Sequence, residues 1–118
     1  MTTSAPEPDC LFCLIVAGEV PATIVARTEN VVAFEDINPS APMHVLVVPT
    51  THHGDVSQLA AAAPDVLAEL VGVAEQVAGE RADGQFRLIF NSGPHAGQTV
   101  FHVHAHVLGG TQLGALVG

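Results

Sequence analysis

The segment TVFHVHAHVLGG, at residues 99–110, constrains the fold more than any other feature of the chain. Side chains of an extended strand point alternately to opposite faces, so His102, His104 and His106 are expected to share one face. The apolar residues between them share the other face, which can pack on a core. Neighbouring imidazoles then lie about 7 Å apart, twice the rise per strand residue. One ligand could therefore contact all three rings.

Three interpretations of this histidine face are open. The first is a solvent-facing run without chemistry. The second is a zinc site, because catalytic zinc often takes three nitrogen ligands from the protein. The third is nucleophilic attack on phosphorus by a ring that is largely neutral at neutral pH. In that case the flanking rings can bind developing charge or protonate a leaving group.

The loop NSGPHAGQT precedes the histidine segment and favours phosphoryl chemistry. Gly93 and Gly97 allow the backbone to approach a ligand closely and to aim N–H groups at an anion. Asn91, Gln98 and Thr99 add neutral donors. A loop of this kind next to three histidines is typical of an oxyanion or phosphate cradle, which a catalytic zinc site would not need.

Charge excludes one class of partner and narrows the substrate. The formal net charge is −9, with no lysine, and the fixed cations are Arg27, Arg81 and Arg87. Binding a nucleic-acid backbone needs clustered lysine and arginine, so nucleic acid is excluded as a partner. A polyphosphate would also be repelled, which favours a substrate with about one negative charge.

The start MTTSAPEPDC has no basic or apolar leader features, and no apolar run reaches the ~18 residues of a membrane span. We therefore expect a cytoplasmic location without membrane contact. Residues 1–8 are expected to form a disordered tail, and residues 9–118 one domain.

Hydrophobic periodicity predicts an α+β domain with a mainly antiparallel sheet. A short helix is expected from Asp9, as its N-cap, to Gly18, and a long helix within 55–82, with the helix proper beginning at Pro64. The expected strands are 22–28, 31–36, 43–49, 86–91 and 99–108.

Cys10 and Cys13 form a CLFC motif at the start of the short helix. Plain core packing, a redox pair with lowered thiol pKa, and a structural zinc that needs two further ligands are the open interpretations. A thioredoxin-like site is not expected, because no strand precedes the motif.

The histidine segment reads His–φ–His–φ–His–φ–φ, where φ is apolar. Three blocks, DCLFCLIVAGEVPA, VVAFEDINPSAPMHVLVVPTTHH and LIFNSGPHAGQTVFHVHAHVLGG, extend the match over most of the chain. The chain thus resembles the histidine-triad (HIT) family, in its Hint branch of nucleotide hydrolases. The resemblance implies a HIT-like fold and hydrolysis of P–N bonds in purine nucleoside 5′-phosphoramidates, such as the phosphoramidate of AMP.

The resemblance also implies roles for single histidines. His104 matches the nucleophile that forms a nucleotidyl-histidine intermediate, and His102 and His106 match the flanking residues that orient it and bind the phosphoryl group. His44 matches a histidine that supports the triad through hydrogen bonds. From its apolar strand alone, His44 could equally be a core residue.

The remaining implied residues bind the nucleotide. Asp36 matches the carboxylate that holds the ribose hydroxyls, although capping the turn at Asn38-Pro39 is an alternative from the residues themselves. Thr99 stands where the family usually has serine near the leaving-group nitrogen. Polar residues at the phosphate end and apolar residues at the base pocket complete the set: Asn91, Gln98, Phe34, Ile37 and Phe12.

Bacterial members of the family suggest His52 and His102 as partners of Cys10 and Cys13 around a structural zinc, which the chemistry itself would not require. His53 and His95 are expected to be exposed loop histidines without a role. The resemblance implies a homodimer through the long helix and an edge strand. The ending GGTQLGALVG lacks the tryptophan of the usual family tail. Alternatives are a dinucleoside polyphosphate hydrolase and a zinc- or nucleotide-binding interaction protein with little activity.

Overall fold

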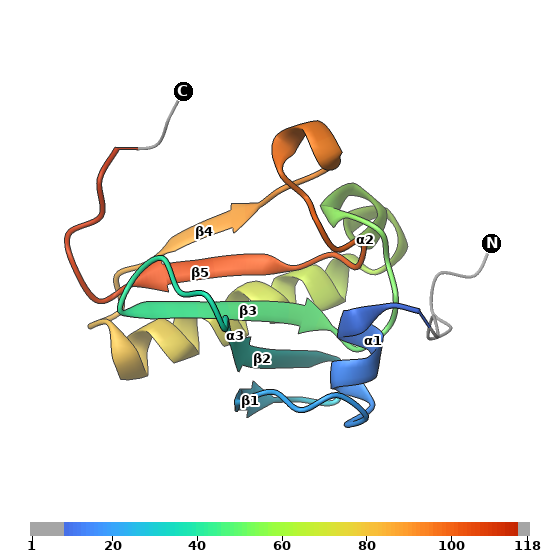
Figure 1. Cartoon of the computed structure of the whole chain (residues 1–118), viewed down its shortest axis with the longest axis horizontal. Helices are drawn as coiled ribbons and strands as arrows, with labels where there is room; N and C mark the ends of the chain where they lie inside the picture. The colour runs from blue at the N-terminus through green and yellow to red at the C-terminus, as the bar shows by residue number, and fades with distance from the viewer. Residues whose placement is uncertain (1–8, 116–118) are drawn as a thin grey trace.

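A computed structural model describes residues 9–115 (Figure 1), so the expected tail at residues 1–8 lies outside the described part of the chain. Five antiparallel strands form one sheet in the order β1-β2-β3-β5-β4, which confirms the predicted α+β class. The strands are β1 (Ile24–Arg27), β2 (Val31–Glu35), β3 (Met43–Pro49), β4 (Arg87–Phe90) and β5 (Ala105–Gly109). The helices are α1 (Leu11–Val16), α2 (Val56–Ala62), α3 (Pro64–Arg81) and the short 3-10 helix η1 (Pro94–Ala96).

Strand β3 lies at the centre of the sheet, and all seven of its residues are buried. Its continuous apolar run MHVLVVP suits a strand that is covered on both faces. Met43 pairs with Gly109 and Val47 with Ala105, so β5 runs antiparallel beside it. His44 is the one titratable residue of this strand.

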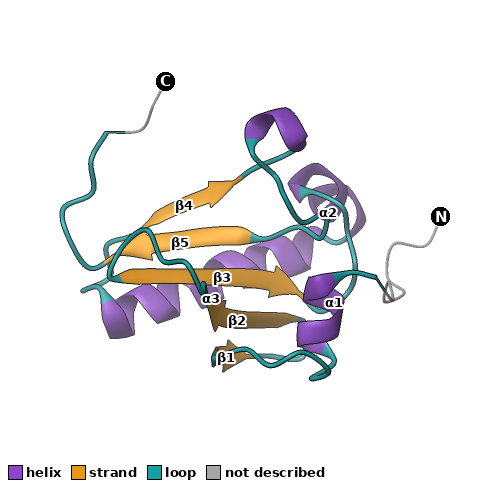
Figure 2. Ribbon diagram, viewed as in Figure 1, coloured by secondary structure: helices purple, strands orange, loops and turns teal. Residues whose placement is uncertain are grey.

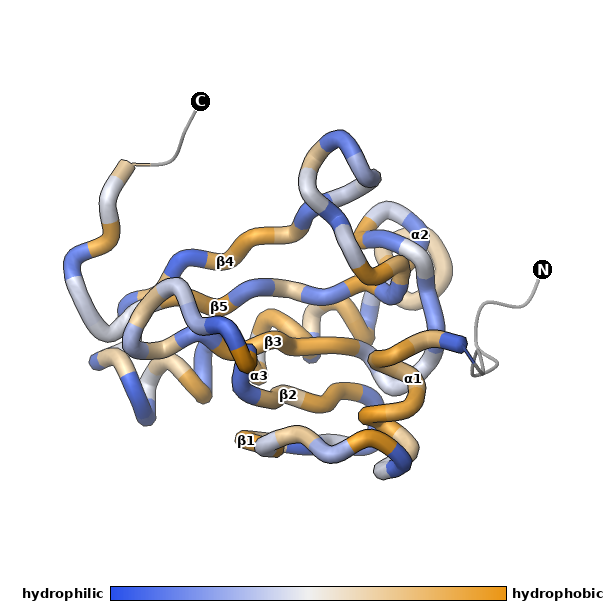
Figure 3. Tube along the Cα trace, viewed as in Figure 1, coloured by the Kyte–Doolittle hydropathy of each residue, from blue (hydrophilic) through white to orange (hydrophobic). Residues whose placement is uncertain are grey.

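The two faces of the sheet carry different layers. Helix α3 lies behind the sheet in Figure 2 and packs on one face through Leu70, Val73 and Val77. On the other face α1 contributes Phe12 and Ile15 to a smaller apolar cluster. In Figure 3 hydrophobic residues are concentrated along β2 and β3 and in α1. Because α1 is short, part of this second face is left for the histidines.

Strand β5 begins at Ala105, which is later than predicted. The pairing of Val47 with Ala105 would place Val103 opposite Pro49, but proline has no N–H with which to continue the ladder. The N–H of Val103 instead donates to the carbonyl of His53 at 2.8 Å. The hydrogen-bonded ladder therefore does not extend back to His102 and His104, although both rings still contact Phe12 on the α1 side of the sheet.

The helices also differ in detail from the prediction. Cys10, not Asp9, is the N-cap of α1, and its sulfur accepts the Cys13 N–H at 3.3 Å. The run before Pro64 forms the separate helix α2. Pro64 is the first residue of α3, as predicted, because its fixed φ suits a first turn and its missing N–H is not needed there.

Among residues 9–115, no helix has both the length and the apolar character needed to cross a membrane.

Candidate active site and candidate metal centre

A row of rings runs across the α1-facing side of the sheet. Strand β5 and the segment before it supply three of the rings, β3 and α1 supply one each, and the loop after β3 supplies the last. Ring-centroid separations within the row are 5.0 Å (His52–His102), 6.0 Å (Phe12–His102), 5.0 Å (Phe12–His104), 5.1 Å (His104–His106) and 5.2 Å (His44–His106).

The proton on the His104 ring is placed by the backbone. Nδ1 of His104 lies 2.9 Å from the carbonyl oxygen of His102. A carbonyl oxygen can only accept, so Nδ1 carries the proton and Nε2 of the neutral ring holds a lone pair. The ring is buried, with Phe12 edge-on at 5.0 Å. His104 thus has the tautomer of a nucleophile at Nε2.

His106 carries its ring proton on the other nitrogen, Nε2. The N–H of Ser40 donates to Nδ1 of His44 at 2.9 Å, so Nε2 of a neutral His44 carries the proton. That nitrogen lies 3.0 Å from Nδ1 of His106 and 3.3 Å from Oδ2 of Asp36. Nδ1 of His106 therefore accepts, and its Nε2 carries a proton. His106 is thus able to donate a proton beside the His104 ring.

Burial is the largest cause that lowers the pKa of both His104 and His106. For His104 the hydrogen bond to the His102 carbonyl and the charge of Asp36 act in the opposite direction. For His106 the neighbouring His104 and His44 add to the lowering, and Asp36 opposes it. Both rings are therefore neutral at neutral pH, the state in which an imidazole nitrogen is nucleophilic.

A second group of donors lies at the other end of the row. One ligand atom from each of Cys10, Cys13, His52 and His102 lies within 4.8 Å of all the others. Nδ1 of His102 is 3.4 Å from both sulfurs, and Nδ1 of His52 is 3.4 Å from the Cys13 sulfur. Two thiols and two imidazoles are a donor set typical of tetrahedral zinc. We call these four residues the Cys-His cluster.

The tautomer of His102 also fits a metal ion. Its Nε2 lies 2.9 Å from the carbonyl oxygen of Pro49, so Nε2 carries the proton and Nδ1 offers its lone pair to the cluster. Burial, the largest cause, lowers the pKa of His102 to about 4, so the ring is neutral. The four residues that the resemblance implied for zinc are thus brought together with suitable donors.

Asp36, His44 and His106 also place three possible ligand atoms within 4.8 Å of one another. This second set fits a metal poorly. The backbone N–H of Ser40 occupies the Nδ1 lone pair of His44, so the nitrogen that faces the other two residues carries a proton. The set suits proton transfer better than coordination.

The structure corrects the expectation for the His102 side chain. Its ring is 0% exposed, and both nitrogens are engaged by Pro49 and the cysteines. It therefore does not face a phosphoryl group beside His104 and His106. The three rings do lie on the α1-facing side of the sheet, as predicted, but the His102 ring is closed off from solvent.

The loop residues divide between shaping the site and facing solvent. Gln98 is buried, accepts the Gly93 N–H at 2.8 Å and donates to the carbonyls of Gly54 and Val100 at 2.7 and 3.1 Å. Its amide is thus used within the loop rather than offered to a phosphate. Thr99 is exposed and Asn91 half-buried, so both can reach a ligand. Gly93 and Gly97 both have φ of +95°, which favours glycine.

Asp36 caps the turn at Asn38, which was one of its two predicted roles. One carboxylate oxygen accepts the Asn38 N–H at 2.8 Å and caps the turn, while the other faces His44. Ile37, 90% exposed, lines with Asp36 and Thr23 a cavity of about 540 Å³. Phe34 is buried against Phe12, with ring centroids 5.5 Å apart, and belongs to the core beneath this region.

His53 was expected to be exposed, but it is 4% exposed. Its Nε2 lies 2.9 Å from the Thr51 hydroxyl, and its carbonyl accepts the Val103 N–H. Nδ1 of His53 has no hydrogen-bond partner among residues 9–115. His95 is exposed in η1, as predicted. The groups that sequence reasoning missed are the N–H of Ser40 and the carbonyl of Pro49, because backbone groups leave no residue-type signal.

The fold and site define a class: an antiparallel α+β protein with adjacent histidines on one face of the sheet. Residues 17–113 match the family model of the HIT domain, and the chain belongs to that family. It is 36% identical to the purine nucleoside phosphoramidase of Escherichia coli K12 over 92% of this chain and 93% of that protein.

Solved structures support the family. A HIT family hydrolase from Clostridium thermocellum matches with a TM-score of 0.88 at 41% identity, over 94% of this chain and 98% of that chain. A zinc-bound histidine triad family protein from Mycobacterium smegmatis matches with a TM-score of 0.75 at 36% identity, over 86% of this chain and 74% of that chain.

Proposed function

We propose that this protein is a hydrolase that cleaves the P–N bond of purine nucleoside 5′-phosphoramidates, of the adenosine 5′-monophosphoramidate type, through a nucleotidyl-His104 intermediate. The observation that carries the proposal is the neutral, buried His104 ring, whose Nδ1 proton is held by the His102 carbonyl at 2.9 Å. The relative named as a purine nucleoside phosphoramidase supports the choice of bond and base.

In the first step Nε2 of His104 attacks phosphorus, and the P–N bond to the amine breaks with its electron pair going to the amine. The amine takes a proton from Nε2 of His106, which regains one from solvent at the same nitrogen, while His44 keeps its proton and donates it as a hydrogen bond to Nδ1 of His106. His106 therefore stays neutral, with its ring centroid 5.1 Å from that of the phosphorylated His104 ring.

In the second step water attacks phosphorus and passes a proton through Nε2 of His106 to solvent. The bond between phosphorus and Nε2 of His104 breaks, which restores the neutral ring and releases the nucleoside monophosphate. Splitting one difficult displacement into two easier ones is the gain from covalent catalysis. We assign Asp36 to the ribose hydroxyls, Thr99 to the leaving group and Asn91 to the phosphate.

Charge favours a phosphoramidate over a dinucleoside polyphosphate. Each arginine is engaged elsewhere: Arg27 with the Val16 carbonyl, Arg81 with Glu35 and Arg87 with the Gly114 carbonyl. No fixed cation is thus left to offset several phosphates.

The test is turnover of the two substrates by the same preparation. We expect release of AMP from adenosine 5′-monophosphoramidate with kcat/KM at least tenfold above that for diadenosine tetraphosphate. Faster cleavage of the tetraphosphate would show that the protein is a dinucleoside polyphosphate hydrolase instead. Cleavage of neither substrate would favour a binding protein.

The Cys-His cluster supports a second assignment, a structural zinc held by Cys10, Cys13, His52 and His102. Such an ion would cross-link α1, the loop after β3 and the segment before β5, and it would supply no chemistry to the phosphorus. The zinc-bound relative from Mycobacterium smegmatis agrees with this assignment. Metal analysis of the untagged protein should find about one zinc per chain.

We also propose a homodimer. Strand β4 lies at the edge of the sheet with one side unpaired, and its residues are only half-buried. Pairing with a second copy would cover this edge. Light scattering should give twice the mass of the 12.2 kDa chain.

A further inference from the structure

His102 belongs to both parts of the site at once. Its ring nitrogen Nδ1 faces the sulfurs of Cys10 and Cys13 at 3.4 Å. Its carbonyl oxygen accepts the Nδ1–H of His104 at 2.9 Å. The ligand atom and the acceptor that sets the nucleophile are therefore parts of one residue, separated by a few covalent bonds.

Few other hydrogen bonds hold the backbone around the His102 carbonyl. His102 lies before β5, so the strand ladder does not hold its backbone. Within the described residues, the segment is tied by the Val103 N–H to the His53 carbonyl and by the ring of His102 to the Pro49 carbonyl. The position of the His102 carbonyl thus depends on where its ring is held.

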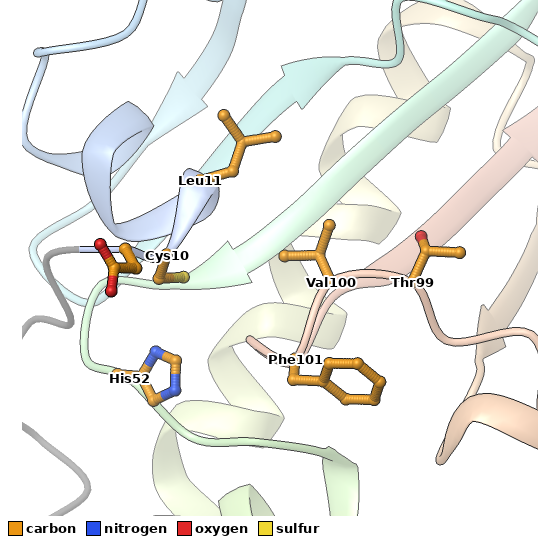
Figure 4. A pocket seen from close by; sticks show the side chains of 7 residues that line it. Cys10, Leu11, His52, Thr99, Val100 and Phe101 are labelled. Atoms are coloured by element: carbon orange, nitrogen blue, oxygen red, sulfur yellow. The ribbon is translucent and has the colours of Figure 1, made fainter.

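The Cys-His cluster is accessible from one side. Cys13 and His102 are buried, whereas Cys10 and His52 are partly exposed and border a cavity of about 430 Å³. Figure 4 shows the Cys10 sulfur and the His52 ring on one side of this cavity, with Thr99 and Phe101 across it. A metal ion could therefore enter and leave without unfolding of the chain.

We propose that metal occupancy of the Cys-His cluster positions the nucleophile: ligation at Nδ1 of His102 fixes the His102 carbonyl and so holds His104 with its proton on Nδ1. His102 is then a positioning residue rather than a phosphoryl-binding one. Thiol hydrogen bonds are weak, so without the ion the ring of His102 is held less firmly. The predicted effect of the metal on kcat rests on the proposed function. The predicted effect of the metal on the His104 ring does not.

The direct test observes the His104 ring by NMR. Full-length protein with ¹⁵N-labelled histidine is stripped with a chelator and reloaded with Zn²⁺, and the imidazole nitrogens are followed by long-range ¹H–¹⁵N correlation. We expect one set of signals with the proton on Nδ1 in the loaded protein, and broadened or mixed-tautomer signals for His104 after stripping. Identical His104 signals in both states would overturn the proposal.

The kinetic test separates positioning from folding. The double variant Cys10→Ser and Cys13→Ser should lower kcat about 10- to 100-fold, the usual effect of losing an outer-shell contact at a metal site. KM and the Kd for AMP should stay within about threefold, because the groups assigned to the nucleotide are untouched. If the double variant does not fold, chelated wild-type protein supplies the same comparison.

Ile15→Ala is the matched control. Ile15 is buried in the same helix α1 and packs in its apolar cluster, and its side chain offers no metal ligand. It should lower Tm while leaving kcat within about twofold. If the double cysteine variant and Ile15→Ala lose the same amount of kcat for the same loss of Tm, the proposed positioning role of His102 is wrong. If zinc-loaded wild-type protein cleaves no phosphoramidate, the proposed function fails, and the NMR comparison still decides the coupling.

Discussion

Backbone groups, more than the spacing of the histidines, decide what each imidazole in this site can do. The carbonyl of His102 places a proton on Nδ1 of His104, and the N–H of Ser40 places one on Nε2 of His44. The carbonyl of Pro49 does the same for Nε2 of His102. Three similar side chains are thus prepared for the different roles proposed for them: nucleophile for His104, hydrogen-bond partner of His106 for His44, and metal ligand for His102.

The His44–His106 hydrogen bond gives a prediction at this scale. His44→Ala removes the donor to His106 Nδ1, so the proton of His106 is no longer held on Nε2 and kcat should fall about 10²-fold, the lower end for general acid–base catalysis. KM should change little. His44→Gln keeps an N–H donor and should recover part of the loss. Steady-state kinetics of the two variants measure this, and wild-type kcat in His44→Ala would contradict this role of His44.

The lowered pKa values predict the pH dependence of stability. His104 and His106 are buried and neutral in the fold, with pKa below the unfolded value of 6.5. Below pH 6.5 the unfolded chain therefore binds more protons than the folded one, and stability falls as pH drops. Above about pH 7 these rings contribute no slope.

Denaturant unfolding between pH 5 and pH 8 measures this effect. His106→Asn should flatten the slope below pH 6.5, whereas His95→Asn, at an exposed loop histidine, should leave the slope unchanged. Equal slopes in the wild-type protein and His106→Asn would show that His106 is not buried in its neutral form.

At the scale of elements, periodicity was sufficient for the sheet. The apolar run at 43–49 became β3 with the same bounds, and Pro64 began α3. The late start of β5 could not be predicted, because Pro49 ends the ladder from a strand more than 50 residues away in the chain.

The packing of α3 on the sheet predicts a large effect at one position and a small one beside it. Leu70 is 0% exposed, and its loss in Leu70→Ala should cost about 2–5 kcal/mol of unfolding free energy. Val71 is 39% exposed, so Val71→Ala should stay within about 0.5 kcal/mol of the wild-type protein. Urea unfolding measures both, and similar losses would contradict the assigned face of α3.

At the scale of the whole molecule, charge predicts the response to salt. With a net charge of −9 the protein repels an anionic substrate, and salt screens that repulsion. Raising ionic strength should therefore lower KM for the monoanionic phosphoramidate, and lower it more for a polyphosphate. A KM that rises with salt for both substrates would indicate a cationic binding surface that the three arginines do not provide.

The residue types of the candidate site could be predicted from the sequence, but its hydrogen bonds and the burial of its side chains could not be predicted as well. The four residues of the Cys-His cluster and the neighbours His44 and His106 were expected from the resemblance and are brought together. The complete burial of the His102 ring, the burial of His53 and the use of Gln98 within its own loop were not. Each of these depends on a backbone group far away in the sequence, which residue types do not reveal.

The central claim is that His104 bonds covalently to phosphorus. The direct measurement is a brief reaction with an adenosine phosphoramidate that carries a label on the nucleotide, an alkaline quench that preserves the phosphorus–imidazole bond, and mapping of the label by mass spectrometry. We predict nucleotide on His104, none on His102 or His106, and no labelled protein or turnover in His104→Ala. Label on another residue, or full turnover in His104→Ala, would contradict the mechanism.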